Sequence, residues 1–121
     1  MADFHLLPGD TPQRETVLEP GDLITHVELP PPRAGSKHAY LKLRDRASYE
    51  FALASAAVVL EITNGTVTRA RIALGGVGTK PWRSPEAEAA LADRPADRAH
   101  FRQAAEAAMR EAKPQSENRF K

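Results

Sequence analysis

Hydrophobic and polar residues alternate along much of the first two-thirds of the chain, and this period of two predicts β-strands. The alternating stretches are residues 23–29, 38–44 and 66–74. A further stretch, residues 51–63, begins with alanines, so it fits either a long strand or a short helical turn that leads into a strand. Its valine-rich second half favours the strand. Asn64-Gly65 follows it, and this pair supplies the positive φ angles of a two-residue hairpin turn.

Helical spacing appears in the last third of the chain. Ser84-Pro85-Glu86 is a helix start, with serine as the N-cap, proline at the first position and glutamate in the first turn. We expect this helix to reach about Ala92, and a second helix, capped by Asp97, to reach about Ala112. The second helix has apolar positions at helical spacing, which we expect to face the core. They are Phe101, Ala104, Ala105, Ala108, Met109 and Ala112.

Strands grouped ahead of helices predict an α+β fold, with a small antiparallel sheet of three to four strands followed by a helical layer. The prolines and glycines of residues 1–21 predict an extended arm, and residues 22–121 form the α+β domain. In the strand 38–44, we expect Ala39, Leu41 and Leu43 to pack on the helices. The opposite face, which carries Tyr40 and Lys42, is then free to meet something polar.

Composition narrows the possible functions. The 121 residues suit one domain, and a formal net charge of +1 argues against a general polyanion binder. The absence of cysteine excludes disulfides, thiolate chemistry and cysteine-ligated metals. The four histidines lack metal-ligand spacing, and no catalytic motif is present. We expect neither a signal peptide nor a membrane span, which leaves cytoplasm and periplasm open.

Charge is concentrated in residues 40–52, YLKLRDRASYEFA, immediately before an almost uncharged strand. One interpretation is a solvated loop, and the other is a bend that faces a ligand or another chain. The mixture of tyrosine and basic residues also fits a small RNA-binding α+β module, although no RNP-like aromatic pair or helix-turn-helix is evident. A stand-alone protein-interaction module without redox chemistry is a further alternative.

Several segments in order resemble the C-terminal domain of the FAD-binding (medium) subunit of molybdenum hydroxylases. This family includes xanthine dehydrogenase, aldehyde oxidoreductase and carbon monoxide dehydrogenase enzymes, and the periplasmic aldehyde oxidoreductase branch is the most similar. The matching segments are DFHLLPGDTPQRETVLEPGDLITHVELP, YLKLRDRASYEFALASAAVVLEI, NGTVTRARIALGGVGTKPWR and the helix at residues 86–91. Together they cover nearly the whole chain.

The resemblance implies a role in a redox enzyme. In the family, electrons from a molybdenum cofactor pass through [2Fe-2S] clusters on partner subunits to FAD, and the flavoprotein places and tunes the flavin. The arm would lead from a flavin domain that this chain lacks, and the domain would stop within SENRFK, before its last helix. We therefore expect weak FAD affinity and no activity from the chain alone. The implied partners are the missing FAD-binding domain and the molybdenum and iron–sulfur subunits, without nucleic acid or membrane.

The resemblance also implies a set of flavin-binding residues, but no catalytic residue and no metal ligand. Lys42 matches the family lysine near the flavin ring, where a cation would stabilise negative charge on the reduced ring. Arg46 matches the arginine of a mobile loop beside the flavin. Tyr49 and Glu50 fall where some relatives carry acidic residues, and a tyrosine at position 49 makes NAD use doubtful.

Overall fold

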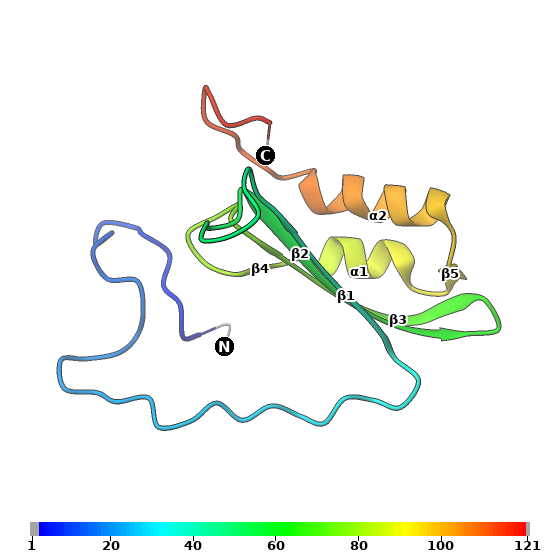
Figure 1. Ribbon diagram of the computed structural model, residues 1–121, viewed down its shortest axis with the longest axis horizontal. Coiled ribbons are helices and arrows are strands. Elements are labelled where there is room, and N and C mark those ends of the chain that lie inside the picture. Colours follow the sequence, from blue (N-terminus) through cyan, green and yellow to red (C-terminus); the bar gives the residue numbers. More distant parts are fainter. Residues whose placement is uncertain (1–2, 121) are drawn as a thin grey trace.

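Residues 3–120 are described by the computed structural model (Figure 1), which has one antiparallel sheet and two helices. The elements are β1 (Lys37–Leu43), β2 (Ala54–Thr63), β3 (Thr66–Gly75), β4 (Trp82–Arg83), α1 (Pro85–Leu91), β5 (Arg94–Pro95) and α2 (Arg98–Met109). The strand order is β1-β2-β3-β4, and β5 also pairs with β3. The predicted α+β fold is confirmed. Beyond the three long strands, the sheet gains two strands of two residues each, which the alternation did not predict.

The β2–β3 hairpin is the centre of the sheet. Asn64 and Gly65 have φ angles of 50° and 77°, as the predicted two-residue turn requires. Leu60 lies opposite Ala70 in the antiparallel register, and both face the helices. Between the two readings of residues 51–63, the structure supports a strand, which begins at Ala54.

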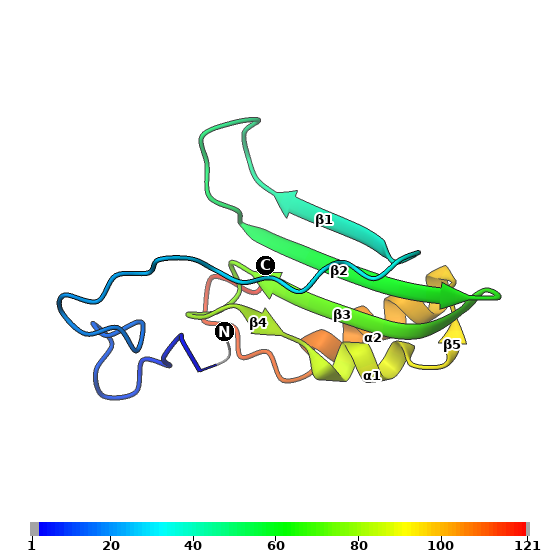
Figure 2. The same ribbon diagram turned by 90° about the horizontal axis from the view of Figure 1, so that it is seen from below.

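Both helix starts are confirmed. The Ser84 hydroxyl accepts a hydrogen bond from Ala87 N at 3.3 Å, and the Asp97 carboxylate accepts one from His100 N at 2.9 Å. The helices cover the β3 side of the sheet and leave β1 at the uncovered edge (Figure 2). The core therefore lies between β3 and the helix pair. Its buried residues are Val67, Ala70, Ala87, Leu91, Ala104 and Ala108.

The predicted core stripe of α2 is partly wrong. Phe101 and Met109 are 39% and 41% exposed, whereas Ala107 is buried together with Ala104 and Ala108. Alanine at a helix contact lets two backbones approach closely, so α2 turns its small residues toward α1 and leaves the larger ones at the margin. The spacing identified the helix but not this rotation about its axis.

The predicted strand at residues 23–29 is also wrong. This segment is extended but pairs with no strand among residues 3–120, and Leu23 and Leu29 are 83% and 79% exposed. A strand needs a neighbour to satisfy its backbone groups, and Pro20 and Pro30 on either side cannot donate hydrogen bonds. The described part of the arm, residues 3–21, has no helix, and its single bridge joins His5 to Thr16. Residues 1–2 and 121, at the ends of the two predicted ranges, lie outside the described residues.

The helices do not cover β1. Leu41 lies opposite Ala56 and so faces the helix side of the sheet, as predicted, yet Leu41 and Leu43 are 69% and 58% exposed. The prediction that they pack on the helices is therefore wrong, because α1 contacts β3, α2 packs on α1, and neither helix reaches this edge. No helix within residues 3–120 has the length and apolar character needed to cross a membrane.

Candidate functional site

The charged bend, residues 44–53 between β1 and β2, projects from one end of the sheet (Figure 2). Its base is closed by a hydrogen bond from Leu53 N to the carbonyl oxygen of Leu43, at 2.9 Å. The bend therefore continues the β1–β2 hairpin beyond the last paired residues, Leu43 and Ala54. The core lies between β3 and the helices, whereas the bend lies beyond the paired ends of β1 and β2. The bend is therefore remote from the core.

Lys42 lies at the root of this bend. It is opposite Ser55, on the sheet face that points away from the helices, and Tyr40 lies on the same face two residues earlier. The Lys42 ammonium is part-buried and donates to the carbonyl oxygen of Glu50 at 2.6 Å. Tyr40 is 67% exposed. This end of the open face therefore carries a cation that is fixed by a hydrogen bond and, two residues earlier, an exposed aromatic ring.

The tip of the bend is held by its own hydrogen bonds. Oε2 of Glu50 accepts from the backbone N–H groups of Asp45 and Arg46, both at 2.9 Å. The Arg46 guanidinium donates to the carbonyl oxygen of Tyr49. Tyr49 has a φ of 55°, in the left-handed region, and its side chain is almost fully exposed. The next ring, that of Phe51, is exposed to the same extent.

The three predicted site residues thus occupy one small region. Arg46 contacts Tyr49 directly, and Lys42 contacts the residue that follows Tyr49. The contribution of Glu50 was missed, since its spacing from Asp45 and Arg46 carries no recognised turn signal. Among the described residues, no group of three or more acidic, histidine or cysteine side chains could hold a metal ion.

A second polar cluster joins α1 to the sheet. The Glu88 side chain is 10% exposed and accepts from Arg83 Nε and Nη2 at 2.9 and 2.8 Å, and from Arg71 Nη1 at 3.2 Å. It also accepts from Ile72 N at 3.1 Å. The hydrogen bonds from Arg83, aided by Ile72 N–H and the charge of Arg71, lower the pKa of Glu88 although burial opposes them. Because these partners lie on β3 and β4, the cluster fixes the helical layer in place.

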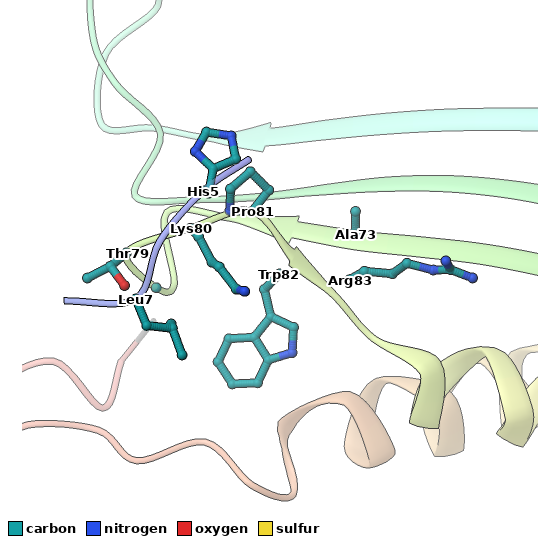
Figure 3. A pocket seen from close by; sticks show the side chains of 9 residues that line it. His5, Leu7, Ala73, Thr79, Lys80, Pro81, Trp82 and Arg83 are labelled. Carbon is teal, nitrogen blue, oxygen red and sulfur yellow. The ribbon is translucent and has the colours of Figure 1, made fainter. Parts of the chain in front are cut away.

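A cavity of about 650 Å³ lies where the arm meets the crossing between β3 and α1 (Figure 3). His5 and Leu7 of the arm border one side, and residues 78–83 border the other. The single tryptophan of the chain, Trp82, lines it, and Lys80 projects toward the same side of the crossing. The arm is thus placed against the domain at this point, on the opposite edge of the sheet from β1.

Sequence comparison identifies relatives that are named as subunits or chains of oxidoreductases. The aldehyde oxidoreductase FAD-binding subunit PaoB of Escherichia coli is 54% identical over 91 residues, which are 75% of this chain and 27% of that protein. The carbon monoxide dehydrogenase medium chain of Afipia carboxidovorans is 39% identical over 72 residues, 60% of this chain and 25% of that protein. The chain therefore spans about a quarter of the length of these relatives.

Solved structures share the fold. Reconstituted CO dehydrogenase from Oligotropha carboxidovorans superposes with a TM-score of 0.80 at 30% identity, over 95% of this chain and 38% of that one. Quinoline 2-oxidoreductase from Pseudomonas putida 86 gives 0.61 at 29% identity, over 66% of this chain and 28% of that one. The superposed 95% of this chain is more than its sheet and helices contain, so the similarity to CO dehydrogenase extends into the arm. Residues 38–121 match the CO dehydrogenase flavoprotein C-terminal domain. This match confirms the resemblance seen in the sequence, and the chain belongs to the CO dehydrogenase flavoprotein C-terminal domain family.

Proposed function

We propose that the chain is the C-terminal part of the FAD-binding subunit of a molybdenum-dependent oxidoreductase of the aldehyde/xanthine type. Its role is to help position the flavin that accepts electrons from iron–sulfur clusters. The observation that carries this proposal is Lys42, a part-buried cation on the open face of the sheet in a domain of a flavoprotein family. The 54% identical relative, an aldehyde oxidoreductase FAD-binding subunit, supports the choice of enzyme type.

The bend has the chemistry that a flavin edge requires. When bound, FAD supplies the electron-accepting ring, which gains negative charge on reduction. Lys42 supplies a positive charge on the open face, and Arg46 supplies a second one at the tip of the bend. Tyr49 offers an exposed ring on which a planar group can rest. We assign Lys42, Arg46 and Tyr49 to the flavin-facing edge.

The exposed apolar residues support a larger assembly. Leu23 and Leu29 of the extended segment, and Leu41 and Leu43 of β1, expose apolar surface that a neighbouring domain could cover. We therefore propose that residues 1–21 lead out of a flavin domain and that residues 22–121 form the C-terminal domain beside it. The molybdenum cofactor and the [2Fe-2S] clusters would be held by partner subunits.

RNA binding is less well supported by the contacts of the bend. A phosphate-binding patch needs cations that are free to reach phosphates. Lys42 and Arg46 instead donate to the carbonyl oxygens of Glu50 and Tyr49. The bend therefore keeps these two cations at fixed positions, as a cofactor edge requires.

FAD binding by a chimera tests the proposal. The segment of the Escherichia coli relative that matches this chain is replaced by the chain, and the same relative cut before that segment is the control. We expect the purified chimera to hold FAD stoichiometrically and the 121-residue chain alone to bind it weakly. A folded chimera without FAD would contradict the proposed role, and tight FAD binding by the chain alone would contradict the view that the main flavin contacts lie elsewhere.

A further inference from the structure

We infer that Glu50 is a positioning residue, which fixes both the tip of the bend and the ammonium group of Lys42. The inference rests on the proposed function for the importance of Lys42. It is carried by contacts within the chain, so it can be tested without flavin.

Glu50 acts through two different groups. Its carboxylate oxygen Oε2 accepts two backbone N–H groups, those of Asp45 and Arg46, at 2.9 Å each. Its backbone carbonyl accepts the ammonium of Lys42 at 2.6 Å. The carboxylate thus ties the residue to the far side of the bend, while the carbonyl holds the cation. Because both groups belong to one residue, releasing the carboxylate also frees the carbonyl to move.

The remaining contacts of the bend depend on the same two hydrogen bonds to the Glu50 carboxylate. Arg46 is fixed by its own N–H to Glu50 and by its guanidinium to the carbonyl of Tyr49. The left-handed φ of 55° at Tyr49 turns the chain back so that Glu50 can reach these amides. A non-glycine residue in this region stays there only when its surroundings fix it, and the Glu50 contacts supply that restraint.

Asp45 provides a matched control within the bend. It is also acidic and exposed, but within residues 3–120 its carboxylate makes no hydrogen bond or ion pair. Replacing Asp45 by asparagine removes the same charge from the same bend and keeps the hydrogen bonds to the Glu50 carboxylate, because these use the backbone N–H of Asp45. Glu50→Gln is a second comparison, since its amide oxygen can still accept N–H groups after the charge is lost.

The test uses the 121-residue chain and two readouts. The first is amide hydrogen exchange at Asp45 and Arg46, with Leu53 N–H, which bonds to Leu43, as the internal reference. The second is the rate of acetylation of Lys42, measured by mass spectrometry relative to Lys37 on the same strand. In Glu50→Ala we expect both readouts to rise by about two- to tenfold, as the loss of hydrogen bonds of ordinary strength predicts. Glu50→Gln should fall between wild type and alanine.

Thermal unfolding separates a local from a global effect. The bend lies outside the core, so Glu50→Ala should leave the unfolding temperature nearly unchanged while both readouts rise. Unchanged exchange and unchanged Lys42 acetylation in Glu50→Ala would overturn the inference, as would equal changes in Asp45→Asn. Failure of the proposed function would appear elsewhere, as a chimera without FAD, and would leave these flavin-free measurements as they are.

Discussion

Glu88 offers the clearest prediction about stability, because one carboxylate, on a side chain that is 10% exposed, joins α1 to two strands. Glu88→Ala removes the acceptor of Ile72 N–H and the ion pairs with Arg83 and Arg71. Leaving a part-buried N–H without a partner costs about 1–3 kcal/mol. The two guanidinium groups are about half exposed, so the ion pairs add only about 0.5–1 kcal/mol in total. We expect the free energy of unfolding to fall by about 1.5–4 kcal/mol.

Urea unfolding followed by circular dichroism measures this loss, with the fluorescence of Trp82 on β4 as a second probe. Glu88→Gln should lose only about 1 kcal/mol, since its amide oxygen can still accept from Ile72 N–H. The folded structure lowers the pKa of Glu88, so its contribution is fully present above the ordinary glutamate pKa of about 4.3. The contribution disappears as the pH falls through the lower folded-state pKa, and the difference between wild type and Glu88→Gln should narrow there. A loss below about 0.5 kcal/mol in Glu88→Ala at neutral pH would refute this reasoning.

Two further substitutions test the core and the turn that follows β3. Leu91→Ala should lower the free energy of unfolding by about 2–5 kcal/mol, because Leu91 is 2% exposed. The control Leu41→Ala, on exposed β1, should change it by less than about 0.5 kcal/mol, and urea unfolding measures both. Gly76→Ala should destabilise by about 1–3 kcal/mol, since Gly76 has a φ of 73° and an added Cβ would lie 3.0 Å from the carbonyl oxygen of Leu53. Gly65→Ala, with a φ of 77° and open space around it, is the control in thermal unfolding and should cost less.

Local signals in the sequence predicted the elements that local interactions determine. The Ser84 and Asp97 caps and the Asn64-Gly65 turn act within a few residues, and all three are found where expected. The antiparallel sheet was also expected, and its three long strands pair with their neighbours in the chain because the connections are short. The short β4 and β5 were not predicted, since two residues carry no detectable alternation.

The errors concern contacts between distant segments. Alternation in residues 23–29 indicated a strand, but a strand forms only beside a partner, and none of the described strands pairs with it. The spacing in α2 could not show that its alanines, and not Phe101 and Met109, would meet α1. At the candidate site, Lys42, Arg46 and Tyr49 were predicted through family resemblance, and the structure brings them together in one bend. The two-sided role of Glu50 arises from the path of the bend, which residue types alone do not determine.

We propose that this domain places Lys42 beside a flavin. The most direct test is the two-electron reduction potential of FAD in the chimera, for Lys42→Gln and for the control Lys37→Gln, whose side chain points to the other face of β1. A cation about 10 Å from the reduced ring would stabilise its negative charge by about 1.7 kcal/mol at an effective dielectric constant of about 20. This corresponds to about 36 mV for a two-electron couple. We predict that Lys42→Gln lowers the potential by about 20–40 mV and that Lys37→Gln leaves it within a few millivolts. Equal potentials in wild type and Lys42→Gln would contradict the account.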